Sequence, residues 1–196
     1  MQFKVLKREQ CYQGFFSIDS ISLQHSLFAG GMSQVISREI IGKGGAAAIL
    51  LYDPAVRKLV LVEQFRVGAM DDSTGAWLTE LVAGYIEPGE EPEQVVRREA
   101  IEEAGCPIEE TVFIGKYYVS PGSTSERMTL YCGKVDSSNI GGIHGLEEEG
   151  EDIRVKVVEV EQALGMLQTG EINSATPWIA LLWLQANESM LRDQWL

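Results

Sequence analysis

Three glutamates near the middle of the chain are spaced so that a single helix would bring their carboxylates together. Glu99, Glu102 and Glu103 stand at positions i, i+3 and i+4, and at about 100° per residue they fall on one side of a helix. Arg98 can pair with Glu102 at i+4 and hold the geometry of the cluster. Like charges at this spacing destabilise a helix, whereas hard cations such as Mg²⁺ prefer such oxygen-rich sites. The spacing therefore indicates either a metal site or a solvated acidic face.

The residues around this cluster predict where the helix begins and ends. Pro92 suits a first helical position, and Gly105 suits the position after the last turn. Val96, Ala100 and Ala104 are spaced by four and share one face. We expect this apolar face to pack on the rest of the domain, with the acidic side chains beside it.

A second group of carboxylates follows in the acidic segment, residues 146–152, which ends a long polar stretch, residues 136–152. A mobile acidic loop can deliver a general base to a bound substrate, although most such runs are solvated surface. The candidate bases are Glu147, Glu148, Glu149, Glu151 and Asp152. Neither His25 nor His144 stands in a recognisable catalytic pairing, and we interpret His144 as structural.

The elements that must position these residues follow from the remaining pattern. Residues 2–41 are rich in short strand-like runs, which predict a small antiparallel β unit, and "GKGG" at residues 42–45 is a plausible junction. We therefore predict an N-terminal β domain over residues 1–44 and a second domain over residues 45–196. The second domain is expected to hold a hairpin around "DPAVR", with strands over residues 46–53 and 58–66, and four further strands over residues 77–84, 111–119, 127–135 and 153–160. Two C-terminal helices are expected, one over residues 161–169 and a last one with Thr176 as its N-cap and Pro177 as its first helical residue.

Composition limits the classes of function. The chain has 196 residues, a net charge of −13 and 45% apolar residues, so it can bury a core, and the acidic balance argues against nucleic acid or an anionic membrane as a partner. The N-terminus lacks the apolar core of a signal peptide, and no apolar run is long enough to span a membrane. Three cysteines without a C-x-x-C spacing favour a reducing compartment. We expect a soluble cytoplasmic protein.

Read together, residues 84–106 contain the pattern G-x5-E-x7-R-E-A-x-E-E-x-G-C. This pattern resembles the Nudix hydrolase box at every defining position. The resemblance implies an α/β/α sandwich around a mixed β-sheet, and hydrolysis of a diphosphate by water with Mg²⁺, or Mn²⁺ as a substitute. It also implies metal ligands: Glu99, Glu103, the carbonyl of Ala83, and Glu102 as an alternate. Metals that bridge phosphate oxygens neutralise their charge and lower the pKa of bound water.

The segments outside the box favour one branch of this family. Pro121 lies sixteen residues after Gly105, as in the ADP-ribose pyrophosphatase branch, and "GFFS", "EQFR", "SPGSTSE" and "GIHGLEEEGEDIRV" resemble segments of the bacterial enzymes. The resemblance runs along nearly the whole chain. It implies hydrolysis of ADP-ribose to AMP and ribose 5-phosphate. By position in the resembling segment, Glu149 is the expected general base and Glu151 a further metal contact, with Arg98 holding the cluster.

The resemblance also implies residues that contact the substrate. Fixed guanidinium groups suit the two phosphates, aromatic faces suit the adenine, and the loop that contains Pro121 suits the terminal ribose. The expected contacts are Arg38 and Arg66 for phosphate, Phe15, Phe16 and Glu39 for adenine, Tyr85 for ribose or phosphate, and Ser120, Gly122 and Glu126 for the terminal ribose.

In the resembling enzymes the N-terminal β unit exchanges contacts between two subunits. The resemblance therefore implies a homodimer with shared sites, in which Phe15 and Glu126 act across the interface. Two alternatives stay open. One is a hydrolase of another nucleoside diphosphate sugar, such as GDP-mannose. The other is a non-catalytic module that senses ADP-ribose, although the intact box argues against it.

Overall fold

The computed structural model describes residues 1–42 and 44–196. The chain forms two compact units, Met1–Gly45 with Tyr117–Arg127, and Ala46–Lys116 with Met128–Leu196. Lys43, in the expected junction, lies outside the described residues. Residues 117–127 thus belong with the first unit although they lie far along the chain, and the boundary between residues 44 and 45 stays a prediction.

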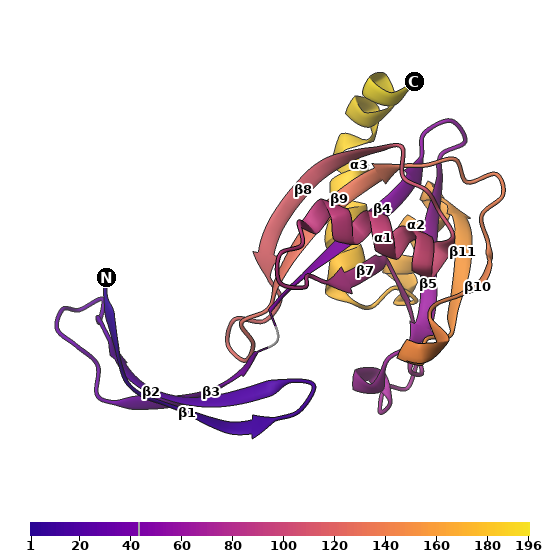
Figure 1. Ribbon diagram of the computed structural model, residues 1–196. Helices are drawn as coiled ribbons and strands as arrows, with labels where there is room; N and C mark the ends of the chain where they lie inside the picture. Colours follow the sequence, from indigo (N-terminus) through magenta and orange to yellow (C-terminus); the bar gives the residue numbers. More distant parts are fainter. Residues whose placement is uncertain (43) are drawn as a thin grey trace. The chain divides into compact units, whose positions relative to one another are not determined.

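The first unit is built on a three-stranded antiparallel sheet (Figure 1). Its strands, in the order of the sheet, are β1 (Phe3–Gln13), β2 (Ser17–His25) and β3 (Ile36–Gly42). The loop of residues 117–127 is tied to the end of β3, because Ile41 donates its amide to Ser123 O at 2.8 Å and accepts from Ser125 N at 3.1 Å. Every residue of β1 is exposed.

The second unit is built on an eight-stranded sheet with the order β10-β11-β5-β4-β9-β8, to which β6 and β7 add through β5 and β4. β4 pairs with β7 through its first half and with β5 through its last residues, so β5 and β6 diverge from β4 and β7. The strands are β4 (Gly45–Asp53), β5 (Lys58–Phe65), β6 (Trp77–Glu80), β7 (Val82–Tyr85), β8 (Glu110–Tyr118), β9 (Arg127–Lys134), β10 (Gly142–His144) and β11 (Ile153–Glu159).

In the described part of the chain, three α-helices cover this sheet and two short 3-10 turns lie in its connections. The helices are α1 (Pro92–Ala104), α2 (Val160–Thr169) and α3 (Ala175–Trp195), and the turns are η1 (Val67–Ala69) and η2 (Glu147–Glu149). Among the described residues, no helix has the length and apolar character needed to cross a membrane.

Three expectations about these elements were wrong in detail. The single strand expected over residues 77–84 is two strands, of which β6 pairs with β5 and β7 pairs with β4. The expected N-cap was Thr176 and the expected first helical residue was Pro177, whereas α3 begins at Ala175 with Ser174 as its N-cap, two residues earlier. Pro177 is therefore the third helical residue, which a first turn accepts because its N–H groups have no helical partner. The stretch of residues 136–152 is also not wholly a loop, because β10 and η2 lie within it. β10 pairs with β11, a long-range contact that its glycines and polar residues conceal.

Alternation along β4 divides the core into two layers. Ile49 packs in one cluster with Val96 and Ala100 of α1, whereas the ring of Tyr52 faces that of Trp195 in α3, with centroids 6.5 Å apart. Successive side chains of a strand point to opposite faces, so α1 and α3 cover opposite faces of the sheet (Figure 1). The buried run from residue 46 to residue 53 follows from this arrangement.

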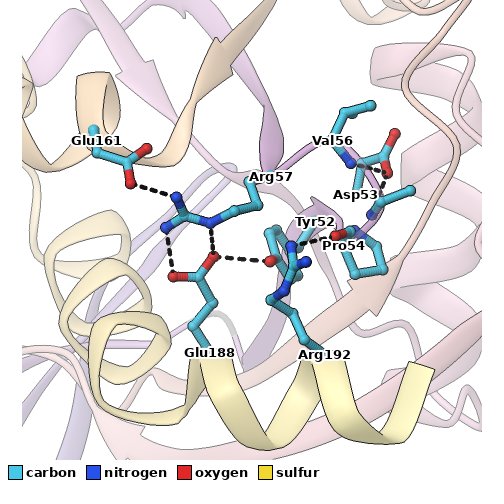
Figure 2. Close-up of polar contacts among 9 residues, drawn as sticks. Tyr52, Asp53, Pro54, Val56, Arg57, Glu161, Glu188 and Arg192 are labelled. Atoms are coloured by element: carbon cyan, nitrogen blue, oxygen red, sulfur yellow. Dashed lines mark hydrogen bonds and ion pairs between the residues drawn. The ribbon is translucent and has the colours of Figure 1, made fainter. Parts of the chain in front are cut away.

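A polar network fastens the tip of the β4–β5 hairpin to the two C-terminal helices (Figure 2). Arg57 binds Glu188 of α3 through two hydrogen bonds of 2.7 and 2.8 Å and reaches Glu161 of α2 at 2.6 Å. Tyr52 donates its hydroxyl to the same Glu188 at 2.9 Å. Arg57 has a φ of 54°, a conformation that costs a non-glycine residue about 1 kcal/mol or more. The network offsets this cost.

Glu188→Gln is expected to lower the free energy of unfolding by about 1–2 kcal/mol. The substitution removes the charge that Arg57 binds, and the side chain of Glu188 is only 17% exposed. Glu161→Gln is the matched control with little expected change, because Glu161 is 64% exposed. Urea titration of both variants measures the difference. Equal effects of the two substitutions would contradict the importance of burial in this network.

Candidate active site

The helix α1 begins and ends where the sequence predicts. Pro92 is its first residue, and Glu91 forms a capping box with Gln94, which satisfies amides that the first turn leaves open. Gly105 follows the last turn in the left-handed conformation, with a φ of 58°, which glycine adopts readily. Val96, Ala100 and Ala104 are buried against the sheet. These contacts fix the rotation of the helix and therefore the direction of its glutamates.

Glu103 is almost fully buried beneath α1, with 2% of its surface exposed. Its Oε2 accepts a hydrogen bond from the amide of Ala83 at 3.0 Å. Ala83 lies in β7, next to Gly84, so the edge strand and the helix meet at this carboxylate. The resemblance to the Nudix family implies the carbonyl of Ala83 as a ligand. The structure adds a contact through its amide that the sequence did not predict.

Glu99 lies directly over Gly84. A Cβ at residue 84 would stand 1.8 Å from Oε1 of Glu99 and 2.7 Å from its Cγ, so only glycine leaves room for this carboxylate. Arg98 donates one nitrogen to both Glu99 and Glu102 at 2.9 Å and lies 3.6 Å from Glu90. The predicted pairing of Arg98 with Glu102 is therefore present in the structure, within a wider group of carboxylates.

Gly84→Ala is expected to lower turnover about 10- to 100-fold, because a shift of about 1 Å in a catalytic group has an effect of this size. The added methyl group must displace Glu99, whereas the backbone of residue 84 tolerates alanine. Gly115→Ala is the control: its Cβ would meet nothing within 4 Å. Steady-state rates and melting temperatures of both variants would be measured. Unchanged turnover in Gly84→Ala would exclude a role for the position of Glu99.

Burial and mutual repulsion raise the pKa values of two of these glutamates. Burial is the main cause for Glu103, whose pKa rises to about 8, and the charges of Glu99 and Glu151 add to it. Burial also raises the pKa of Glu99 to about 7, with contributions from the charges of Glu102 and Glu151, while Arg98 opposes the rise. The cluster thus holds more negative charge than its surroundings compensate.

These residues fit a hard divalent cation by their chemistry. Such ions bind carboxylate and carbonyl oxygens, and the crowded carboxylates carry more negative charge than the neighbouring Arg98 offsets. Within residues 1–42 and 44–196, however, no three acidic, histidine or cysteine side chains already converge as a metal-binding group. Arg98 holds Glu99 and Glu102, and Ala83 holds Glu103. Metal binding would therefore require some of these carboxylates to turn away from their present partners.

The acidic segment is folded back on itself. Its residue Glu151 accepts a hydrogen bond from the amide of Leu146 at 3.1 Å, and its charge raises the pKa of both Glu99 and Glu103. The structure thus brings Glu151 to the α1 cluster. Glu149 is the last residue of η2 and is exposed to solvent, so its carboxylate is accessible to a bound substrate.

Two further candidates lie near this cluster in the second unit. Arg66 donates to Glu80 at 2.7 Å, and its positive charge acts to lower the pKa of Glu103. Tyr85 is half-buried in β7, directly after Gly84. The sequence did not indicate Glu80 as the partner of Arg66. The pairing of β5 with β6 brings the two together, and no local signal in the sequence reports that register.

The remaining candidates lie in the first unit and stay predictions. Phe15 and Phe16 meet edge to face, with ring centroids 4.9 Å apart, and are 69% and 41% exposed. Arg38 and Glu39 are exposed on β3. The third group lies in a tight turn in which Ser120 O accepts from the amides of Ser123 and Thr124: Ser120, Gly122 and Glu126.

This chain belongs to the NUDIX domain family, whose sequence model matches residues 42–182. A crystal structure titled as an ADP compounds hydrolase is similar in fold, with a TM-score of 0.74 at 20% identity, over 98% of this chain and 97% of that one. The fold prediction is therefore confirmed, as is the resemblance to the Nudix family.

Two relatives bear on the substrate. The ADP-ribose pyrophosphatase of Escherichia coli strain K12 is 47% identical over 192 residues, which cover 98% of this chain and 92% of the relative. A GDP-mannose pyrophosphatase of Escherichia coli strain SMS-3-5 is 32% identical over 193 residues, which cover 96% and 98%.

Proposed function

We propose that this chain is a hydrolase that cleaves the diphosphate of ADP-ribose to AMP and ribose 5-phosphate. The observation that carries the proposal is the 47% identity, over nearly the full length of both chains, to an enzyme with this activity in its name. The glutamate cluster of α1, in which Glu103 is buried and Glu99 and Glu102 are half-buried, supports it, because a diphosphate needs concentrated positive charge before water can attack, and this cluster can hold a cation.

Glu99, Glu103 and the carbonyl of Ala83 would hold a divalent cation, with Glu102 and Glu151 as further ligands. We propose Mg²⁺, with Mn²⁺ as a substitute, since both suit oxygen ligands. When bound, the ion would neutralise phosphate charge and make water more acidic. Arg98 keeps the carboxylates of Glu99 and Glu102 in place from the side.

Glu149 is proposed as the general base that takes a proton from the attacking water. The new bond joins the water oxygen to a phosphorus, and the bond from that phosphorus to the bridging oxygen breaks. The second phosphate then leaves with its sugar. The exposure of Glu149 at the end of η2 suits a group that must meet a substrate held against α1, and general bases contribute about 10²–10⁴-fold to rates.

The other predicted residues would recognise the two ends of the substrate. Guanidinium groups bind phosphate through paired hydrogen bonds, and the ring pair of the first unit offers an aromatic edge and face for adenine. We propose Arg38 and Arg66 as phosphate contacts, Phe15, Phe16 and Glu39 as adenine contacts, Tyr85 as a ribose or phosphate contact, and Ser120, Gly122 and Glu126 as contacts for the terminal ribose.

We propose that the protein is a homodimer, with Phe15 and Glu126 reaching the site of the partner. Its first unit supports this, because Phe3 is 74% and Phe28 fully exposed, and large exposed apolar side chains favour association. Sedimentation equilibrium at micromolar concentration should give twice the mass of the chain, 21.7 kDa. A monomer at the concentration used for the assays would refute the shared site.

We also place the protein in the cytoplasm. Cys11, Cys106 and Cys132 are all unpaired in the structure, and an odd, sparse set of thiols suits a reducing compartment.

A product assay tests the function. The purified protein would be incubated with Mg²⁺ and, separately, with ADP-ribose, GDP-mannose, UDP-glucose and NADH. The proposal predicts that AMP and ribose 5-phosphate appear in equal amounts and that ADP-ribose has the highest kcat/KM. A higher kcat/KM for GDP-mannose would still support diphosphate hydrolysis but would refute ADP-ribose as the preferred substrate. Tight binding of ADP-ribose without cleavage would favour the sensing module.

A further inference from the structure

His144 covers the C-terminal end of α1. A Cβ built on Gly105 would stand 2.7 Å from Cε1 of the His144 ring and within 3.5 Å of both ring nitrogens. The ring therefore lies on the α-carbon of Gly105 and fills the place that a side chain would take. The glycine serves two purposes here: it adopts a φ of 58°, and it makes room for the imidazole.

Hydrogen bonds fix the ring and the chain beside it. Nε2 of His144 lies 2.9 Å from Gly141 O; because a carbonyl only accepts, Nε2 carries the proton. The next residue, Gly145, donates its amide to Glu102 O at 3.1 Å. β10 also pairs His144 with Ile153 of β11, which is fully buried. The chain is thus held at the point where it enters the acidic segment.

The acidic segment itself is a closed turn that starts at this point. Leu146 and Glu151 exchange contacts: the amide of Leu146 binds Oε2 of Glu151, and Leu146 O accepts from the amide of Glu151 at 3.2 Å. Gly145 has a φ of 101°, and a Cβ there would stand 2.7 Å from Cβ of Glu151. Because the acidic segment is closed on itself, its position relative to α1 depends largely on the residues that anchor it, His144 and Gly145.

We propose that His144 is a positioning residue: its packing on Gly105 sets the place of the acidic segment, and hence of Glu149 and Glu151, relative to the glutamates of α1. The ring touches no reacting group, and it acts through the backbone that it anchors. The catalytic consequence rests on the proposed function, whereas the anchoring itself is independent of it. A displacement of about 1 Å in a catalytic group can lower a rate 10²-fold.

The first test removes the ring. In His144→Ala we expect kcat for ADP-ribose to fall about tenfold or more, while KM stays within about threefold. Amide hydrogen exchange should become faster at Gly145, Leu146 and Glu151, because local opening releases those hydrogen bonds. His144→Gln retains a donor for Gly141 O and should restore part of kcat and of the protection.

The second test uses the contact with Gly105. Gly105→Ala should lower kcat in the wild-type background by pushing the ring away, but should cause no further loss of kcat in His144→Ala. Alanine at residue 105 is strained by the left-handed backbone and should lower the melting temperature in both backgrounds. The melting temperature therefore reports this strain separately from the effect on kcat. Additive effects of the two substitutions on kcat would show that they act independently and would overturn the proposal.

Three further outcomes would overturn parts of the proposal or separate it from the proposed function. Unchanged exchange of residues 145–151 in His144→Ala would overturn the anchoring. Lost protection with unchanged kcat would show that the place of the acidic segment does not matter, which overturns the catalytic part. If the wild-type protein cleaves none of the assayed diphosphates, the proposed function fails, and the exchange experiment still tests the anchoring.

Discussion

Glu103→Gln is expected to lower the turnover of ADP-ribose by about 10²–10⁴-fold, because a ligand of the cation contributes several kcal/mol and each 1.4 kcal/mol is tenfold. Gln keeps an oxygen that can accept from the amide of Ala83, so the fold is expected to persist. Initial rates of AMP release with saturating Mg²⁺ measure the effect.

Glu93→Gln is the matched control for this prediction. Glu93 lies on the same helix, but it binds Arg97 and Thr111, away from the carboxylate cluster, and its substitution is expected to leave turnover nearly unchanged. If Glu103→Gln and Glu93→Gln had similar rates, the cluster on α1 would not be the catalytic centre.

Glu103→Gln is also expected to change the unfolding free energy of the metal-free protein. The raised pKa of Glu103, about 8, means that the folded state keeps a proton that the unfolded state has already released. The unfolding free energy of the metal-free protein should therefore fall as the pH rises from about 5 to about 8. Glu103→Gln removes the part of this dependence that Glu103 causes, while Glu99, whose pKa is also raised, keeps a part, and the variant should be the more stable form at pH 8, by on the order of 1–3 kcal/mol. Urea titrations at both pH values measure it.

Glu149→Gln is expected to lower kcat by about 10²–10⁴-fold, the usual contribution of a general base, while KM changes little. The amide is close in size to the carboxylate but cannot take a proton from water. Glu149 is exposed, so its substitution should not disturb the core, and the melting temperature should match that of the wild type.

The neighbours of Glu149 supply the controls, because the sequence alone does not decide which glutamate of this turn is the general base. Glu147 and Glu148 lie in the same 3-10 turn and are exposed as well, so Glu147→Gln and Glu148→Gln share its charge change and its surroundings. Only Glu149→Gln should lose most of its turnover. A larger loss in either neighbour would move the role of base to that residue, and near-normal turnover in all three would refute a base on this turn.

The sequence predicted the fold best where local chemistry determines it. Pro92 and Gly105 bound α1 because the first has no amide to satisfy and the second adopts a positive φ. β10 was missed because three residues with two glycine neighbours carry no strand pattern, and the strand exists through its pairing with β11. The start of α3 was misplaced by two residues, since a proline is accepted anywhere in the first turn.

The same distinction applies to the site. The cluster of glutamates on α1 follows from helical spacing alone, and the pairing of Arg98 with Glu102 follows from its i+4 separation. The bond from Ala83 to Glu103, the pair of Arg66 with Glu80, and the packing of His144 on Gly105 join residues that are between 14 and 39 positions apart. These contacts depend on strand register and on how α1 lies on the sheet, which no short stretch of the sequence encodes.

The most direct test of the account is one assay of metal dependence with ADP-ribose. Protein stripped with a chelator would be assayed alone and after addition of Mg²⁺, with both products quantified. The account predicts that stripped protein is inactive and that Mg²⁺ restores release of AMP and ribose 5-phosphate in equal amounts, in the wild type and not in Glu103→Gln. Undiminished hydrolysis without a divalent cation, or no hydrolysis with it, would contradict the account.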